Sequence, residues 1–300
     1  MDNKALTQLT LAMIIFGSVG FFSSLTGLPA IELVFVRLIC AAIFLFTAWM
    51  ISGKFKTEVW DKKELLFIIL CASANLLNWI FLFKSFEQIS ITIAISLYHL
   101  APIFVLIVGS LLFKEKLTWL SMFAISLCFI GTVLIMGLGE LSSSSLGWSG
   151  IVNSVLAAVF YAAVMLLGKS ISKASVYATT CLQMTIGIVL LVPFVNFTAY
   201  TTLDSMQWFY AIFTGIVHTG IVYLLFFNSI RHLSTQIVSF MIFVDPAVAI
   251  LLDIFLTDFR PDWLQWSGIL LIFGGLFMTL KPAKSRSDME DVVVVEKVEA

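Results

Sequence analysis

Long apolar runs recur along the whole chain, separated by short polar connections. The hydrocarbon core of a bilayer is about 30 Å thick, so a helix that crosses it needs roughly 20 apolar residues. The runs have this length and are continuously apolar, which is typical of helices and not of the alternating strands of a membrane barrel. We predict ten transmembrane helices, at residues 6–24, 31–52, 65–85, 90–113, 118–138, 149–168, 176–197, 208–229, 234–256 and 263–281.

The composition favours lipid over water as the environment of this chain. Hydrophobic residues make up 60% of the 300 residues and charged residues 12%, whereas a soluble domain carries roughly 25% charged residues. The net charge of −1 gives no basic surface that would bind a nucleic acid. The cysteines lie inside apolar runs without the spacing of metal ligands, so we expect no metal or other cofactor. They are Cys40, Cys71, Cys128 and Cys181.

Lysine and arginine are concentrated on one side of the predicted topology. With the N-terminus in the cytoplasm, the cytoplasmic segments hold thirteen of these residues, against Arg260 and the helix-end Lys84 on the other side. Because cytoplasmic loops carry the excess of positive charge, we predict a multi-pass protein of the bacterial cytoplasmic (inner) membrane with both termini in the cytoplasm. The first apolar run has no clear cleavage site after it and is expected to remain as a span. The polar segment at 282–300 is expected to be a disordered cytoplasmic tail.

The second half of the chain repeats the first half, weakly, at an offset of 144 residues. The matches continue without gaps through the third to fifth and the eighth to tenth predicted helices, and they pair Pro102 with Pro246. Five helices per half is an odd number, so the halves must lie in the membrane in opposite orientations. Inverted repeats of this kind recur in alternating-access transporters, whose substrate site lies near the midplane. We predict a first repeat at 1–140 and a second at 147–281.

Ionisable residues at the depth of the bilayer centre are candidate functional groups, because the insertion of a charged side chain at the centre of a transmembrane helix costs about 2.5–3.5 kcal/mol of free energy. Asp245 stands in the middle of the ninth predicted helix, before Pro246, whose missing N–H should leave the carbonyl of Ile242 without its helical partner. His99 lies three residues before Pro102 and shares a helix face with it. Asp245 or His99 could carry a proton during transport, or each could be a neutral, packed group.

Amides and aromatic rings at helical spacing outline a predicted cavity. Aromatic faces, amide donors and one carboxylate suit a zwitterion or an organic cation, although packing between helices and anchoring at the membrane interface are alternative roles for each residue. For Arg37, two turns into the second helix, we expect a structural clamp on neighbouring helix ends, and Pro102 and Pro246 are also predicted to be structural. The predicted cavity residues are Asn75, Asn78, Trp79, Tyr98, His99, Asn153, Tyr161, Thr219, Tyr223 and Asp245.

Short motifs occur in both halves of the chain. They are Phe16-Gly17, Arg37, Leu100-Ala101-Pro102, Leu112-Phe113-Lys114-Glu115, Asp245-Pro246 and Gly274-Gly275, within about residues 5–281. With the topology and the repeat, these motifs resemble the drug/metabolite transporter superfamily, in particular its EamA-like family of ten-helix bacterial exporters of metabolites and amino acids. The chain departs from the family pattern at Phe16-Gly17, where Trp-Gly is commoner, and at Thr257-Asp258-Phe259, where Gly-Glu is usual.

The resemblance implies a carrier of small metabolites, often amino acids. We therefore expect a secondary transporter that moves amino acids or related zwitterions across the cytoplasmic membrane, in the export direction, by alternating access. A transporter of organic cations such as quaternary amines, or a passive channel, is the alternative. The sequence has no HExxH, GxSxG, P-loop or CxxC motif, so neither an enzyme nor an ATP-driven pump is expected. The expected partners are a small-molecule substrate and the bilayer, for a monomer or a homodimer.

Overall fold

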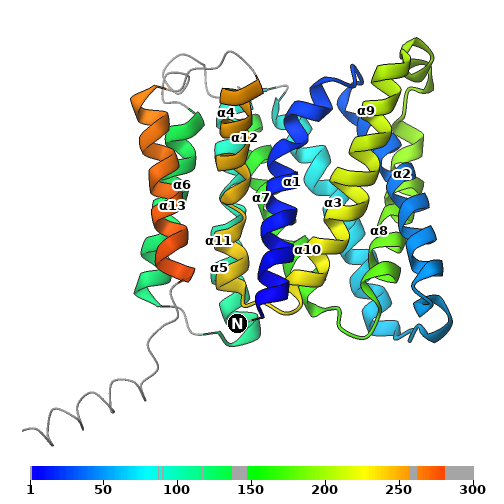
Figure 1. Ribbon diagram of the computed structural model, residues 1–300, viewed down its shortest axis with the longest axis horizontal. Coiled ribbons are helices and arrows are strands. Elements are labelled where there is room, and N and C mark those ends of the chain that lie inside the picture. Colours follow the sequence, from blue (N-terminus) through cyan, green and yellow to red (C-terminus); the bar gives the residue numbers. More distant parts are fainter. Residues whose placement is uncertain are drawn as a thin grey trace, which may run out of the picture.

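The computed structural model is helical throughout the part of the chain that it describes (Figure 1). Both the tail predicted at 282–300 and the Thr257-Asp258-Phe259 motif lie outside this part. The described residues are 2–86, 88–89, 91–115, 118–136, 147–256 and 262–280.

The longest helices run from one end of the bundle to the other, and successive elements are joined by short connections (Figure 1). In chain order they are α1 (Asn3–Ser24), α2 (Ala30–Ile51), η1 (Lys54–Thr57), α3 (Lys62–Phe86), α4 (Ile91–Tyr98), α5 (Ala101–Phe113), α6 (Trp119–Met136), α7 (Trp148–Ser170), α8 (Val176–Leu191), η3 (Val192–Phe194), η4 (Phe197–Thr202), α9 (Ser205–Gly215), η5 (Ile216–Ile221), α10 (Val222–Ile230), α11 (Thr235–Met241), α12 (Val244–Leu256) and α13 (Trp263–Leu280).

The helices have the length and composition of membrane spans. In the described part of the chain, each predicted span coincides with one helix or with consecutive helices. This confirms an all-helical, multi-pass membrane protein, while the count of ten crossings stays a prediction. Three shorter apolar helices lie at 101–113, 119–134 and 263–275. Within the described residues, seven segments are long and apolar enough to cross a membrane: Asn3–Ser24, Ala30–Ile51, Lys62–Leu82, Trp148–Ser170, Val176–Phe194, Ser205–Ile230 and Thr235–Leu256.

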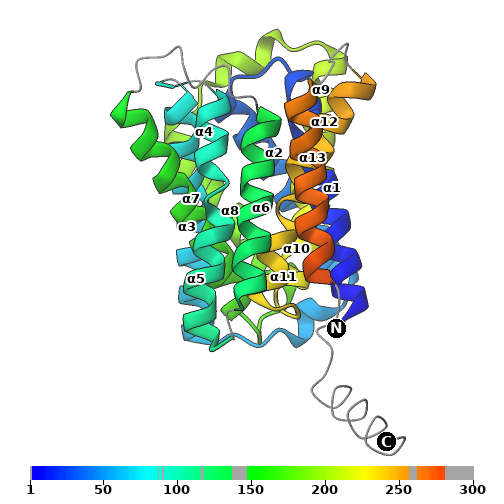
Figure 2. The same ribbon diagram turned by 90° about the vertical axis from the view of Figure 1, so that its left-hand side faces the viewer.

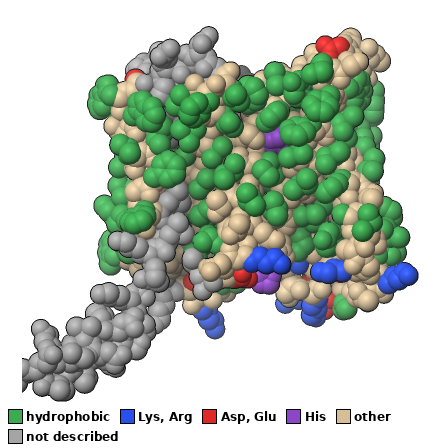
Figure 3. Space-filling view, in the orientation of Figure 1, with side chains coloured by type: hydrophobic (Ala, Val, Ile, Leu, Met, Phe, Trp, Pro, Cys, Tyr) green, Lys and Arg blue, Asp and Glu red, His purple; other side chains and the backbone are tan. Residues whose placement is uncertain are grey.

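On the face shown in Figure 3, apolar side chains cover the side of the bundle, whereas Lys and Arg side chains gather at the edge near the N-terminus marked in Figure 1. A soluble protein rarely exposes apolar surface of this extent, but lipid-facing helices require it. We call the edge near the N-terminus the basic end, and the other edge the opposite end. The basic end carries Lys54, Lys56, Lys62, Lys63, Lys169, Lys173 and Arg231.

Two of the predicted spans are broken near their midpoints. A turn at 99–100 separates α4 from α5, and a turn at 242–243 separates α11 from α12. Pro102 and Pro246 stand in the first turns of the helices that follow, where a missing N–H is tolerated. The breaks therefore occur at nearly the same place in the two halves.

One prediction about the second break is wrong. The carbonyl of Ile242 does not lack a partner, because the N–H of Asp245 donates to it at 3.2 Å. The chain tightens here into turns that join residues three apart, as the bond from the Phe243 N–H to the Phe240 carbonyl at 3.1 Å also shows. A tight turn replaces the helical donor that Pro246 cannot supply.

The segment from α9 to α10 contains a π turn, η5. The N–H of Val222 bonds the carbonyl of Val217, and the hydroxyl of Thr219 lies 3.3 Å from the carbonyl of Thr214, in each case five residues earlier. Such turns are rare and are often found at functional sites.

Helices that are distant in sequence pack in pairs along the bundle. The pairs with the most extensive contact are α6 with α13 and α3 with α7, followed by α2 with α8 and α1 with α12 (Figures 1 and 2). Glycine allows the closest approach between α6 and α13, because a Cβ at Gly131 would lie 2.6 Å from the carbonyl oxygen of Gly268.

Candidate functional site

A cavity of about 410 Å³ lies inside the bundle and extends from its middle toward the opposite end. Gly20 and Ser23, in the last turns of α1, and Ala30, at the start of α2, line it at the opposite end. Gly20 and Ala30 are exposed, so they mark the mouth of the cavity. None of the described Lys and Arg side chains of the basic end is among the lining residues.

The structure brings together most of the predicted cavity residues. These residues come from α3, α4, α7, α10 and α12 and from the turn after α4, so both halves of the chain contribute side chains. Whether these residues bind a substrate stays a prediction. Those that line the cavity are Asn75, Asn78, Trp79, Tyr98, His99, Tyr161, Tyr223 and Asp245.

Two predicted residues lie elsewhere. Asn153 is two helical turns from Tyr161, at the opposite end, where its Nδ2 donates to Gln88 Oε1 at 2.9 Å. Helical spacing placed it on the right face of α7 but at the wrong depth. Thr219 is fully buried behind Arg37 and does not reach the cavity.

Arg37 lines the cavity, although its sequence position predicted only a structural role. Its Nε donates to the Thr219 hydroxyl at 3.0 Å, and its Nη2 donates to the His218 carbonyl at 3.4 Å. Both acceptors belong to η5, so the π turn holds one edge of the guanidinium. A guanidinium has five N–H donors, and its Nη1 group has no partner among the described residues. Arg37 thus combines a clamp on η5 with a charge that faces the cavity.

Asp245 is the second charged residue of the lining. Within the described chain, its carboxylate has no ion-pair or hydrogen-bond partner. Its backbone is fixed by close packing against α1, since a Cβ at Gly17 would lie 2.6 Å from the Asp245 carbonyl oxygen and 2.7 Å from Val248 Cβ. No ion pair joins Asp245 to Arg37, because the ion pairs found in the described chain both lie at the basic end. The cavity therefore contains the guanidinium of Arg37 and the carboxyl group of Asp245, which are not paired with each other.

The amides of α3 hold aromatic side chains in place. Asn75 Nδ2 lies 3.3 Å from the Tyr223 hydroxyl. Asn78 Nδ2 lies 3.3 Å from the Tyr98 hydroxyl and donates to the Ala157 carbonyl at 2.7 Å. The two asparagines were predicted to offer donors to a substrate, but in this structure they orient the tyrosines that line the cavity.

Aromatic rings form much of the remaining wall. Tyr98 and Tyr161 stack with their ring centroids 5.2 Å apart, and Phe16 meets Tyr223 edge-on at 6.0 Å. His99 Nδ1 lies 2.9 Å from the Ile95 carbonyl. Because a carbonyl only accepts, this contact assigns the proton to Nδ1 and leaves Nε2 as an acceptor.

Arg37 and Phe16 line the cavity, although sequence reasoning did not include them among the cavity residues. Arg37 was assigned a clamp alone, and Phe16 was noted only as part of a motif, because an apolar ring in an apolar helix carries no signal of its own. The mid-helix depth of Arg37 was the available signal, since a buried charge in a membrane is a functional candidate by default.

Comparison with known proteins places the chain among transporters. The sequence profile of the EamA-like transporter family matches residues 3–137 and 148–281. An uncharacterized transporter of Bacillus subtilis (strain 168) is 50% identical over 288 residues, which are 96% of this chain and 93% of that protein. A protein known from a crystal structure superposes with a TM-score of 0.82, covering 94% of this chain and 100% of its own. At 14% identity, that likeness shows the fold alone.

Proposed function

This chain belongs to the EamA-like transporter family, and from that membership we propose a secondary transporter of amino acids or related zwitterions. The observation that carries the proposal is that Arg37 and Asp245 line one cavity without pairing with each other. A buried charge without a partner is costly. A zwitterion brings a carboxylate for Arg37 and an ammonium group for Asp245, so it can compensate both charges at once.

We further propose alternating access by two inverted repeats, at 1–140 and 147–281, with ten spans in all. The contacts between helices support this arrangement. The offset of 144 residues relates α2 to α8 and α6 to α13, and each of these helices packs against its own counterpart. The same offset relates α1 to α7 and α5 to α12. In accordance with this relation, α1 packs on α12 and α7 packs on α5. The two broken helices, at 99–100 and 242–243, obey the same relation within one residue.

The proposed orientation places the basic end, with both termini, in the cytoplasm of a bacterium, in accordance with the excess of Lys and Arg there. In this orientation the cavity opens away from the cytoplasm. The export direction follows from the family resemblance alone. Asp245 and His99 remain the groups proposed to carry a coupling proton, since both face the cavity.

An organic cation is the second candidate substrate. The carboxylate of Asp245 shares the cavity with Trp79, Tyr98, Tyr161 and Tyr223, and aromatic faces attract cations such as quaternary amines. Arg37 argues against this substrate, because its permanent positive charge would repel a cation in the same cavity. A passive channel is a third candidate, and it is disfavoured because the cavity does not continue to the basic end.

A matched set of ligands separates these candidates. We would add to the purified protein an amino acid, its methyl ester and the corresponding acid without the amine, and would measure the shift in Tm and the Kd. The proposal expects the complete zwitterion to bind, with about tenfold or greater loss for each truncated ligand, because one charge of the cavity is then left uncompensated. An ester that binds as tightly as the amino acid would favour the organic-cation alternative.

Variants of the two charged residues sharpen the test. Arg37→Gln should weaken binding of the amino acid but not of the methyl ester, and Asp245→Asn should weaken binding of both ligands. Asp61→Asn, in an exposed ion pair at the basic end, is the control and should bind as the parent protein does. Saturable counterflow in liposomes separates a carrier from a passive channel, whose flux would follow the gradient without saturation.

A further inference from the structure

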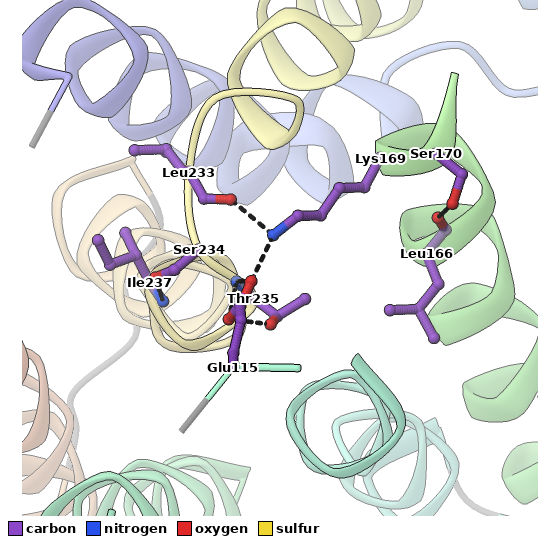
Figure 4. A network of polar contacts seen from close by, with 8 residues as sticks. All are labelled: Glu115, Leu166, Lys169, Ser170, Leu233, Ser234, Thr235 and Ile237. Carbon is purple, nitrogen blue, oxygen red and sulfur yellow. Dashed lines mark hydrogen bonds and ion pairs between the residues drawn. The ribbon is translucent and has the colours of Figure 1, made fainter. Parts of the chain in front are cut away.

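A buried polar cluster lies at the basic end, away from the cavity. It consists of Glu115 in the loop after α5, Lys169 in the last turn of α7, and Leu233 and Thr235 around the start of α11 (Figure 4). Lys169 Nζ donates to Glu115 Oε1 at 2.8 Å and to the Leu233 carbonyl at 2.8 Å. The Thr235 N–H donates to Glu115 Oε2 at 2.8 Å, and the Thr235 hydroxyl donates to the same oxygen. We call this set the Glu115 cluster.

The Glu115 cluster is held by hydrogen bonds between charged groups that are largely buried. The side chains of Lys169 and Glu115 are only 12% and 19% exposed, so water weakens their attraction less than at an open surface. Hydrogen bonds between charged groups are shorter and stronger than neutral ones. The Glu115 carboxylate also accepts the backbone N–H of Thr235, the first residue of α11. Removing either charged partner would leave the other buried without compensation.

The cluster joins the two halves of the chain. Glu115 belongs to the first half, whereas Lys169, Leu233 and Thr235 belong to the second. The helices beneath it are in tight contact, because a Cβ at Gly109 of α5 would lie 2.5 Å from Thr235 Cγ2 and 3.1 Å from Leu166 Cδ2. The basic end is therefore closed where α5, α7 and α11 meet.

In the sequence, the positions that the repeat relates to the Glu115 cluster do not hold an equivalent set of polar residues. The polar members of the cluster are Lys169, Thr235 and Glu115. The offset of 144 residues relates them to Leu25, Ile91 and Phe259, in the same order. Asp258 stands one position earlier than Phe259, but a leucine and an isoleucine offer no side-chain donor to a carboxylate. At the opposite end, the last turns of α1 and the helix α4 flank the cavity instead, through Ser23 and Ile95.

We propose that the Glu115 cluster is a one-sided gate, which holds the transporter in the state open at the opposite end and must break before the cavity can open at the basic end. The inference rests on the proposed transport function and on its inverted repeats. Because the sequence does not repeat these polar residues at the related positions of the other half, we expect the two access states to differ in free energy. The state closed at the basic end is therefore the resting state.

Thiol labelling tests the gate without a substrate. Ser23→Cys places a thiol at the mouth of the cavity, and Leu106→Cys places one on α5 at a fully buried position between the cavity and the cluster. Each is introduced into the otherwise native protein, whose own cysteines are free thiols and set the background rate. The rate of reaction with a hydrophilic maleimide is measured on purified protein in nanodiscs, where both ends are accessible.

Breaking the cluster should shift the labelling toward the basic end. Glu115→Gln and Lys169→Met should each raise the rate at Leu106→Cys by about tenfold and lower the rate at Ser23→Cys, because both remove an interaction that only the resting state makes. Lys169→Arg keeps the charge and should retain the parent rates. Asp61→Asn and Lys173→Met remove the other ion pair of the basic end, whose side chains are 28% and 58% exposed, and should change neither rate.

Every outcome bears on the gate. Unchanged rates in both Glu115→Gln and Lys169→Met would overturn the proposal, and so would a rise at position 106 without a fall at position 23, which indicates local loosening only. If Glu115→Gln does not fold, Lys169→Met and Thr235→Val decide. The ligand measurements are independent of these rates, so failure of the gate with intact zwitterion binding is distinguishable from failure of the transport function.

Discussion

Arg37 and Asp245 are held in the cavity by different means. The guanidinium of Arg37 is fixed through its side chain, by the Thr219 hydroxyl and the His218 carbonyl of η5. Asp245 is fixed through its backbone, by the turn before α12 and by the contact with Gly17. Residues that never touch a substrate can therefore affect binding by moving one charge or the other.

Thr219 should act as a positioning residue for Arg37. Thr219→Val keeps the shape of the side chain but removes the acceptor at 3.0 Å from Arg37 Nε, so the guanidinium loses one of its two tethers. We expect the affinity for an amino acid to fall by about fivefold, the effect of one lost hydrogen bond, while a ligand without a carboxylate is unaffected. Thr219→Ser restores the hydroxyl and should restore affinity, and calorimetric titration of both variants checks this.

Gly17 should be intolerant of even one methyl group. The Cβ of Gly17→Ala would meet the backbone oxygen of Asp245 at 2.6 Å, and a backbone atom cannot swing aside as a long side chain can. Overpacking of this kind costs about 1–3 kcal/mol, so we expect a lower Tm and a weakened site. Gly20→Ala, on the same helix with nothing within 4 Å of its Cβ, is the control. Equal Tm values for the two variants would contradict the packing described here.

At the scale of the elements, the two broken helices and the π turn are where the chain departs from regular helix, and all three adjoin the cavity or hold its residues. Hydropathy predicted the helices well because lipid requires long apolar runs. It predicted the breaks only as prolines, and η5 left no signal in the pattern. Arg37 could be placed at membrane depth from the sequence, but its contact with Thr219 joins residues 182 apart, which spacing along one helix cannot reveal.

Pro246 should be required for the geometry of the site rather than for stability. Pro246→Ala supplies an N–H that can bond the Ile242 carbonyl in the regular helical manner, in place of the present bond from Asp245. The turn would then become helical and would move Asp245 relative to Arg37. We expect binding of an amino acid to weaken by about tenfold, as small displacements in a binding site can cause, with no loss of Tm. Pro193→Ala, at an exposed position in η3, should leave binding unchanged.

Over the whole molecule, the cavity and the Glu115 cluster lie toward opposite ends of the bundle, and each has its charged groups on both halves. In the proposed transport cycle, this arrangement would link substrate binding to a movement of one half against the other. The sequence could predict the repeat and the polar residues near the midplane. It could not predict the Glu115 cluster, because in the sequence Glu115 and Lys169 are ordinary charged residues at the ends of predicted spans, and only the fold brings them within 2.8 Å.

The gate should be insensitive to pH around neutrality. Burial acts to raise the pKa of Glu115, but the hydrogen bonds from Lys169 and Thr235 outweigh it and hold the pKa below the usual value of a glutamate. The stabilisation that Glu115 gives to the closed basic end is therefore fully present above the usual pKa of a glutamate, about 4.3. It is lost only as the pH falls through the lowered pKa of Glu115 in the folded protein. For Ser23→Cys and for Leu106→Cys, the labelling rate at about pH 6 should equal the rate of the same variant at about pH 8, once both are corrected for the pH dependence of thiol reactivity. A corrected rate that differs between the two pH values, in opposite directions for the two variants, would contradict this assignment.

The tethered guanidinium of Arg37 also bears on the electrical tightness of the membrane. A protein that exposes its interior to each side in turn must not let sodium ions or protons leak down the membrane potential. Arg37 keeps its charge at any accessible pH and cannot withdraw far from η5, so it forms a standing electrostatic barrier like those that keep cations out of water channels. For the proposed transporter, we expect a substrate with no net charge to pass this barrier and a bare inorganic cation to be turned back.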